Sequence, residues 1–405
     1  MRPLHTVNKE RMCPMDYNAA ALAMHEKYHG KLAVESLFSV KDRDALSTAY
    51  TPGVAEPCRQ IAKKPEDVYR YTLKSRTVAV VTNGTAVLGL GNIGPEAGLP
   101  VMEGKCVLFK EFGGVDAFPI CLNATTKEEV VAAVKAIAPT FGGINLEDIR
   151  SPECFEIEAE LERDLDIPVF HDDQHGTAII VLAGVLNALK VVGKDIRRIR
   201  VVQNGPGAAG NAIIKMLQTA GVEDIVAVDE HGILYPGRPA GLAGHKASLA
   251  QTTNPRHLTG GLAEAVKGAD LFIGTSVGGA LTAEMAASMA PDAIVFAMAN
   301  PNPEILPEDA KAAGVRVVGT GRSDFPNQVN NVLAFPGIFK GALAVRARDI
   351  NAQMKLAAAS ALAGLIPDEE LNEENILPKA FDPRVAQAVA DAVAKAARES
   401  GVARL

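Results

Sequence analysis

The sequence predicts an α/β protein in which a doubly wound parallel sheet follows a first, smaller α/β domain. From Arg198 onward short apolar runs alternate with helical segments, and strands that alternate with helices of this length form parallel sheets. A glycine turn, NGPGAAG, closes the first of these runs. The length of 405 residues is too great for one ordinary core. We therefore expect domains at residues 1–178, 179–345 and 346–405, the last a helical tail that returns to the first domain.

The first domain is expected to begin with helices and to continue with strands. Residues 17–38 carry Ala, Leu and Met at helical spacing, and Pro57 opens another helix. The stretch 77–91 predicts two strands joined by Asn83-Gly84, a strong hairpin signal, and 104–123 predicts two more strands. The remaining elements are a helix, a strand, a helix, a strand and a long helix, at 127–141, 144–149, 152–165, 167–173 and from Thr177.

The second domain and the tail follow a simpler pattern. The strands and helices of the second domain end in the glycine, acidic or polar residues that commonly end such elements. The tail is Ala-rich and helical, with breaks at Pro367, Pro378 and Pro383. The expected strands of the second domain are 198–205, 224–232, 271–276, 293–301 and 315–321, and the expected helices are 210–221, 262–269 and 283–290.

The pattern G-x-G-x-x-G occurs twice, at 89–94 and 205–210, and each copy has an acid about 20 residues further on. Pro95 and Pro100 follow the first copy and are expected to spoil a helix there. A proline-free helix follows the second copy, which therefore predicts a Rossmann-like dinucleotide site, with a turn that binds no ligand as the alternative. The first copy is expected to offer backbone amides to a substrate carboxylate. The expected cofactor-binding residues of the second copy are Gly205, Pro206, Gly207, Ala208, Ala209 and Gly210.

Asp229 lies at the end of the next expected strand, where an acid can accept hydrogen bonds from both hydroxyls of the adenosine ribose. The same charge would repel a 2′-phosphate. Glu230 and His231 follow it directly, and no Arg or Lys does. The sequence therefore favours NAD over NADP, and NADP stays open because a cation from elsewhere in the chain can reach this site.

Two pairs of adjacent acids end two expected strands of the first domain. The pairs are Glu147 with Asp148, and Asp172 with Asp173. Glu147, Asp148 and Asp173 supply three oxygen ligands, which suits Mg²⁺ or Mn²⁺, and the alternative is a solvated acidic edge. His171 and His175 have the spacing of a zinc pair. The helix is expected to begin near Thr177, so the two histidines need not share one face.

Composition excludes several broad classes. A net charge of −7 argues against a nucleic-acid or anionic-membrane surface, and the apolar run 179–189 is too short to span a bilayer. The polar start has no secretory apolar segment. The cysteines are scattered, odd in number and without a C-x-x-C pair, so we expect reduced thiols in a cytoplasmic protein. They are Cys13, Cys58, Cys106, Cys121 and Cys154.

Taken together, the motifs resemble those of malic enzymes of the short bacterial type, over nearly the whole chain. The helical tail closes the sequence, so we expect no acyltransferase-like extension of the kind that some bacterial relatives carry. The motifs are YTPGVAEPC, GLGNIG, GKCVLFK, NLEDI, FHDDQHGTA, NGPGAAG, VDEHGILYPGR, MANP and NQVNNVLAFPG.

The resemblance implies roles for individual residues. Tyr50 would be the general acid and Lys105 the general base, neutral in a desolvated site beside a metal. Asp172 would lie against substrate and base. The metal ligands would be Glu147, Asp148 and Asp173; Asn300 and Asn331 would hold malate, with Asn330 near the nicotinamide. One departure matters: longer malic enzymes carry an arginine before the first glycine motif, and TAVLGLG has none here.

The implied activity is the oxidative decarboxylation of L-malate to pyruvate and CO₂, with NAD(P)⁺ and Mg²⁺ or Mn²⁺. An oxaloacetate decarboxylase, a malolactic enzyme or a tartrate dehydrogenase on the same scaffold would share this residue inventory. A nucleotide-sensing binding protein and a metal-free amino-acid dehydrogenase are the alternatives from other classes. The family favours dimers or tetramers, and whether Tyr50 and Lys105 act within one subunit stays open.

Overall fold

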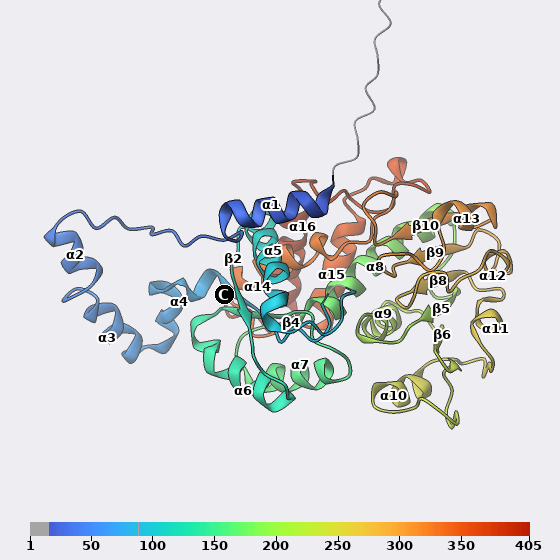
Figure 1. Ribbon diagram of the computed structural model, residues 1–405, viewed down its shortest axis with the longest axis horizontal. Coiled ribbons are helices and arrows are strands. Elements are labelled where there is room, and N and C mark those ends of the chain that lie inside the picture. The colour runs from blue at the N-terminus through green and yellow to red at the C-terminus, as the bar shows by residue number, and fades with distance from the viewer. Residues whose placement is uncertain (1–15, 88) are drawn as a thin grey trace, which may run out of the picture.

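Two sheets covered by helices form the body of the computed structural model, which describes residues 16–87 and 89–405 (Figure 1). The predicted α/β fold with a doubly wound second sheet is confirmed. Cys13 lies outside the described residues.

The first sheet has the strand order β2-β1-β3-β4, and all of its strands are parallel. Every residue of β1 is buried, as expected of a central strand with helices on both faces. Glu147 follows β3 directly, and Asp172 follows β4. The strands are β1 (Thr77–Thr82), β2 (Asp116–Cys121), β3 (Gly143–Leu146) and β4 (Val169–His171), and the helices of this domain are α5 (Pro95–Gly113), α6 (Lys127–Ile137) and α7 (Glu153–Asp164).

The second sheet has the order β10-β9-β8-β5-β6-β7, with only the edge strand β7 antiparallel. The chain leaves β5 toward β6 and later returns to β8 on its other side. The strand order therefore reverses beside β5, the place where doubly wound sheets bind ligands. The strands are β5 (Arg200–Asn204), β6 (Asp224–Asp229), β7 (Gly232–Ile233), β8 (Leu271–Gly274), β9 (Ile294–Ala297) and β10 (Val317–Thr320). The helices are α9 (Ala208–Thr219), α10 (His245–Thr252), α11 (Leu262–Val266), α12 (Ala283–Ala287) and α13 (Pro307–Ala312).

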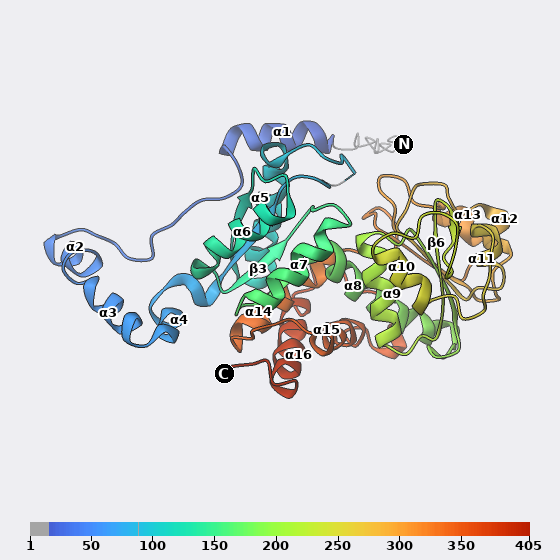
Figure 2. The same cartoon turned by 90° about the horizontal axis from the view of Figure 1, so that it is seen from below.

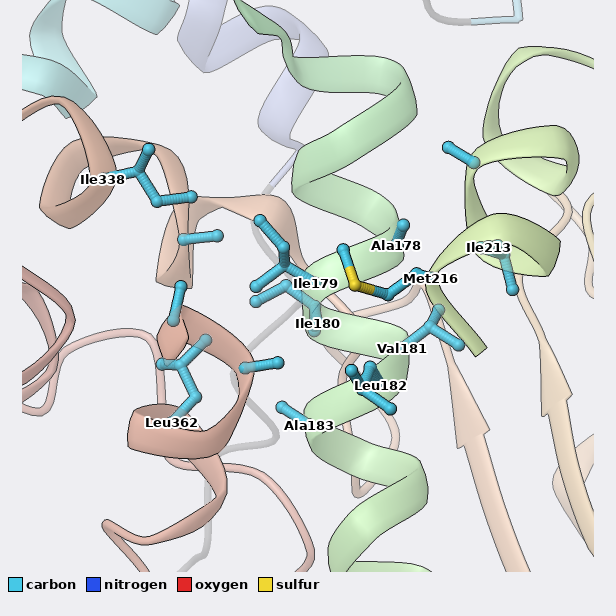
Figure 3. Close-up of a cluster of buried hydrophobic side chains, with 14 of the residues drawn as sticks. Ala178, Ile179, Ile180, Val181, Leu182, Ala183, Ile213, Met216, Ile338 and Leu362 are labelled. Atoms are coloured by element: carbon cyan, nitrogen blue, oxygen red, sulfur yellow. The ribbon is translucent and has the colours of Figure 1, made fainter. Parts of the chain in front are cut away.

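One long helix, α8 (Asp172–Val192), joins the two halves. Its apolar residues Ile179–Ala183 are fully buried. Figure 3 shows them between Ile213 and Met216 of α9 on one side and Ile338 and Leu362 on the other. Among the described residues α8 is the one helix long and apolar enough to cross a membrane, yet 67% of its most apolar window is buried inside the protein. We interpret it as a core helix.

The C-terminal helices are α14 (Phe335–Ala344), α15 (Ala352–Ala363) and α16 (Val385–Glu399). They pack against one another, and α14 and α16 contact α5 of the first domain while α15 contacts α8. The rings of Phe335 and Phe339 lie against Phe109 of α5, with centroids 4.7 and 5.4 Å apart. Helix α14, which the sequence placed in the second domain, therefore packs on the first domain together with α16 of the tail.

The N-terminal helices contribute no buried residue. They are α1 (Tyr17–Tyr28), α2 (Arg43–Ala49), α3 (Ala55–Lys63) and α4 (Val68–Tyr71). In both views α1 lies beside α5, whereas α2 and α3 project away from the sheets (Figures 1 and 2). We call residues 32–72 the arm. Its exposed apolar side chains are Leu32, Val34, Leu37, Phe38, Val40, Leu46, Tyr50, Val54 and Tyr71.

Three predictions about the first domain were wrong. The hairpin at Asn83-Gly84 does not form, because parallel β2 and β3 already occupy both edges of β1. The segment 104–113 lies in α5, where Met102, Cys106 and Phe109 form the buried face at helical spacing. Helix α8 begins at Asp172 and not near Thr177, so both acids lie in its first turn.

The prolines after the first glycine motif do not prevent a helix, which is a further correction. Pro95 is the first residue of α5, where its missing N–H would have had no intrahelical partner. Pro100 lies inside α5, and its carbonyl accepts a hydrogen bond from Lys31 Nζ at 2.7 Å. Both glycine motifs therefore lead into helix N-termini.

Candidate active site

The structure brings the two acid pairs together at the carboxyl ends of β3 and β4. One oxygen each of Glu147, Asp148 and Asp173 lie within 4.8 Å of one another. Asp148 has a left-handed backbone with φ of 53°, and its N–H donates to Asp173 Oδ2 at 2.8 Å. Asn145 Nδ2 donates to Glu147 Oε2 at 2.9 Å. The backbone turn after β3 therefore aims the first pair at the second.

Lys105 of α5 reaches this cluster from the opposite side. Its Nζ lies 2.6 Å from Asp172 Oδ2 and 2.8 Å from Glu147 Oε1, and the side chain is only 9% exposed. It also stands 4.3 Å from the centroid of the Phe335 ring. Asn331 Nδ2 donates to the same Asp172 oxygen at 2.5 Å. Asp172 thus fixes the position of the lysine.

Charge in this cluster is out of balance. Burial raises the pKa of Glu147 to about 7, and Lys105 offsets that rise only in part. Burial likewise raises the pKa of Asp172 to about 7 and raises the pKa of Asp173. Burial alone would lower the pKa of Lys105, but Asp172 and Glu147 raise it above its ordinary value. The expected neutral lysine is therefore not the form that these neighbours favour.

The donor set fits a hard divalent cation. Glu147 and Asp148 are buried and Asp173 is half-buried, so their carboxylates repel one another, and a cation among them relieves both the repulsion and the cost of burial. The zinc pair is not assembled: His175 Nε2 lies 2.9 Å from Glu158 Oε1. Within the described part of the chain, the three acids form the only such metal-ligating group, and it contains no histidine.

A cleft of about 420 Å³ separates this cluster from the second sheet. Asp173 and Thr177 line it from the first domain, Ala208 and Ala209 from the glycine turn, and Asn300 from the loop after β9. The other lining residues are Ala86, Gly89, Ile149, Ser151, Thr275, Ser276, Met298 and Ala299. One acid of the proposed metal site, the second glycine motif and the first glycine motif therefore line the same cleft.

The second glycine motif has the geometry of a phosphate-binding turn. Gly205 has a φ of 89°, and a side chain there would meet the carbonyl of Thr275 at 2.7 Å. A side chain on Gly210 would meet the carbonyl of Gly205 at 2.1 Å, so its absence allows α9 to pack closely on β5. Gly207 caps α9 without a side-chain hydrogen bond, which leaves the first N–H groups of α9 available to an anion. The Pro206 carbonyl lies 2.7 Å from His245 Nε2.

Asp229 lies at the end of β6, as expected, but it already has partners. Arg238 donates to its two oxygens at 2.7 and 2.8 Å, and Lys246 Nζ donates at 2.8 Å. Burial alone would raise the pKa of Asp229, but these hydrogen bonds lower it to about 2. Two cations therefore balance Asp229 and Glu230, and the expected repulsion of a 2′-phosphate is largely cancelled.

The structure leaves other expected residues outside the cluster. Tyr50 ends α2 on the arm, and its side chain is 68% exposed. Asn330 Oδ1 accepts the N–H of Val332 at 3.0 Å and thereby shapes the turn that presents Asn331. Neither Asn330 nor Asn331 is among the described residues that line the cleft.

Sequence reasoning missed three polar residues that shape the site. Arg238 and Lys246 pair with Asp229, and Glu158 of α7 lies buried behind Asp172 and Asp173. The signal for Arg238 was its place after YPG, a turn that brings the chain back past β6. Glu158 follows Ile157 in an otherwise ordinary charged helix, and no local pattern marks it as buried.

Comparison with known proteins agrees with this geometry. Residues 29–129 and 124–162 match the malic enzyme N-terminal domain, and residues 174–398 match the malic enzyme NAD binding domain. The chain is 59% identical over 391 residues to a bifunctional malic/malolactic enzyme of Bacillus subtilis, covering 96% of this chain and 95% of that one. It is 57% identical to an NAD-dependent malic enzyme of Geobacillus stearothermophilus, covering 93% and 78%.

A solved structure shares both the fold and the sequence. The crystal structure of malic enzyme from Pyrococcus horikoshii superposes with a TM-score of 0.90 at 51% identity, over 95% of this chain and 92% of that chain. Full-length identity of this size, together with matches to both domains, establishes that the chain belongs to the malic enzyme family.

Proposed function

We propose that this protein catalyses the oxidative decarboxylation of L-malate to pyruvate and CO₂, with NAD⁺ as the hydride acceptor and Mg²⁺ or Mn²⁺ as the metal. The observation that carries the proposal is the shared cleft, in which Asp173 of the acid cluster faces the glycine turn and Asn300. A simple dehydrogenase needs the turn and a base. The acid cluster adds the means to stabilise the charge that develops when CO₂ leaves.

Glu147, Asp148 and Asp173 are the proposed metal ligands. A divalent ion there supplies Lewis-acid stabilisation of negative charge at the C2 oxygen of the substrate. Asn300 is placed to hold a malate carboxylate from the opposite wall of the cleft. The amides of the first glycine motif, which reaches the cleft at Gly89, stand in for the arginine that this chain lacks. We assign Asn331 to substrate binding together with its hydrogen bond to Asp172, and Asn330 to the nicotinamide side.

Lys105 and Asp172 are proposed to act as one proton-accepting unit. Their atoms lie 2.6 Å apart, so a proton taken from the C2 hydroxyl can be shared between them. Asp172 raises the pKa of Lys105, whereas Lys105 lowers the pKa of Asp172, and a cation on Glu147 would remove one of the two carboxylates that keep Lys105 charged. Tyr50 then protonates C3 of the enolate that decarboxylation leaves, which gives pyruvate.

The cofactor is proposed to be NAD, with NADP also accepted. The amides that begin α9 face the pyrophosphate side of the cleft through Ala208 and Ala209. At the ribose side, Lys246 is bonded to both Asp229 and Glu230, and Glu230 is 68% exposed. When the exposed Glu230 turns away, Lys246 keeps its bond to Asp229, and its other N–H groups can donate to a 2′-phosphate.

The working unit is proposed to be a homodimer, alone or within a homotetramer, that exchanges arms. Helix α2, which Tyr50 follows, projects away from α5, which carries Lys105, and the arm exposes apolar side chains. In a dimer the two arms can cover each other's apolar side chains, and the arm of one subunit can bring its Tyr50 to Lys105 of the other. We place this dimer in the cytoplasm, in keeping with the free thiols of Cys58, Cys106, Cys121 and Cys154.

Mixing two inactive variants tests the shared site. Tyr50→Phe and Lys105→Ala homodimers are unfolded together, refolded and assayed. In a shared site each mixed dimer regains one intact site, so activity returns to about a quarter of wild type. If both residues act within one subunit, the mixture stays as inactive as its parents.

Initial rates test the activity itself. The protein is given L-malate with NAD⁺ or NADP⁺, with and without Mn²⁺, and NADH, pyruvate and lactate are measured. Metal-dependent NADH and pyruvate formation is expected. Lactate is measured because the Bacillus subtilis relative is named a bifunctional malic/malolactic enzyme. Pyruvate formation from oxaloacetate with no turnover of malate would replace the proposal by an oxaloacetate decarboxylase.

A further inference from the structure

Glu158 is a buried carboxylate that the chemistry above does not use. It lies on α7, the helix that follows the first acid pair, and it is only 6% exposed. A buried carboxylate is costly unless hydrogen bonds and positive charge compensate it. Its partners therefore indicate what it does.

All three of its hydrogen-bonding partners lie at the junction of β4 and α8. Glu158 Oε1 accepts the backbone N–H of His171 at 2.9 Å and lies 2.9 Å from His175 Nε2. Its other oxygen accepts from Gln174 Nε2 at 2.9 Å. These partners flank Asp172 and Asp173 on both sides. One carboxylate thus holds the short segment that carries both acids.

The same contact links the two segments that carry the acids, in addition to the pairing of β3 with β4. Glu147 and Asp148 precede α7, whereas Asp173 lies in the first turn of α8, and the N–H of Asp148 donates to Asp173 Oδ2. Glu158 adds a connection from α7 to the first turn of α8. Lys355 of α15 adds positive charge near Glu158, so the carboxylate is compensated from the far side as well.

We propose that Glu158 is a positioning residue for the metal site, which holds Asp173 in register with Glu147 and Asp148 through His171, Gln174 and His175. The proposal rests on the proposed metal site. Neighbours that orient metal ligands typically change metal affinity by about 10- to 100-fold when they are replaced. Glu158 touches neither substrate nor metal, so its loss should weaken metal binding more than it slows the loaded enzyme.

The test measures Mn²⁺ binding to the whole protein by electron paramagnetic resonance, without turnover. In Glu158→Gln the side chain keeps its size but loses its negative charge, and one of its two acceptor oxygens becomes an NH₂ donor. The dissociation constant for Mn²⁺ should rise about tenfold or more. Glu156→Gln is the matched control: it makes the same change two residues away on α7, where the side chain is 64% exposed, and its dissociation constant should match wild type.

Two further measurements separate positioning from a general loss of structure. NADH fluorescence should titrate Glu158→Gln to the same number of sites as wild type, and saturating Mn²⁺ should restore kcat to within about threefold. Equal Mn²⁺ affinity in Glu158→Gln and wild type would overturn the proposal. So would a loss of NADH sites that excess Mn²⁺ does not restore. If wild type itself binds no Mn²⁺, the proposed metal site fails instead.

Discussion

Two acid clusters in this protein differ in their balance of charge. The first cluster contains Glu147, Asp148, Asp172 and Asp173. Its one cation is Lys105, which contacts Glu147 and Asp172. In the second cluster Asp229 and Glu230 form ion pairs with two cations, Arg238 and Lys246. The pKa values follow that balance: Glu147 and Asp172 rise to about 7, and Asp229 falls to about 2. An excess of buried carboxylates indicates a place for a cation, whereas the carboxylates of Asp229 and Glu230 already have cationic partners.

The largest expected effect comes from removing the one cation of the unbalanced cluster. Lys105→Ala takes away the proton acceptor and leaves four carboxylates without compensation. Malate oxidation should fall by about 10²–10⁴-fold, the usual size of a general acid–base contribution. Stopped-flow measurement of NADH formation checks this. A loss below about threefold would move the base to another group, with Asp172 the next candidate.

The next effect comes from removing one charge of the metal set. Asp173→Asn should raise the Mn²⁺ concentration for half-maximal activity by at least about tenfold, since one ionic ligand is lost. EDTA should abolish wild-type turnover, and excess Mn²⁺ should restore it. Asp368→Asn is the control, because that side chain is 79% exposed and lies outside the cluster. Full activity of metal-stripped wild type would contradict the metal assignment.

A smaller effect is expected at the balanced cluster. Lys246→Met removes the cation that is proposed to pair with a 2′-phosphate, and a lost hydrogen bond to a charged group corresponds to about tenfold in kcat/KM for NADP⁺. The value for NAD⁺ should stay within about threefold. Lys267→Met, an exposed lysine at the end of α11, serves as the control. Equal losses with both cofactors would mean that Lys246 supports the fold of this cluster and not cofactor choice.

The smallest effect is on acid stability. The pKa of Asp229 is lowered from 3.8 to about 2, so the folded state binds its proton less readily than the unfolded chain does. Its stabilisation is fully present above pH 3.8 and is lost as the pH falls toward 2. With allowance for solvent screening this is about 1 kcal/mol. Urea-unfolding midpoints between pH 2 and 5 should therefore fall less steeply for Asp229→Asn than for wild type, and parallel curves would refute the assignment.

The sequence predicted the second sheet well because each strand and helix there carries its own periodicity and end signals. It also placed Glu147 and Asp173 correctly, since the ends of parallel strands lie along one edge of a sheet. It failed at α5, where an apolar run with β-branched and aromatic residues suits either period and two prolines suggested a break. Contacts between distant segments were beyond it. Arg238 reaches Asp229 across a turn, and the fold leaves Tyr50 exposed on the arm, away from the acid cluster.

Helix α8 has a consequence for exchanging parts between relatives. The boundary expected between residues 178 and 179 cuts this helix between its acidic first turn and the segment that packs on α9. A chimera joined there would combine the acids of one parent with the helix body of another, and every mismatch in the packing would displace Asp173. A junction beyond Val192 transfers the helix intact, but it then pairs one parent's α8 with the other's α9. Helix α8 carries acids of the first domain and packs on α9 of the second, so neither domain can be exchanged without changing contacts of the other.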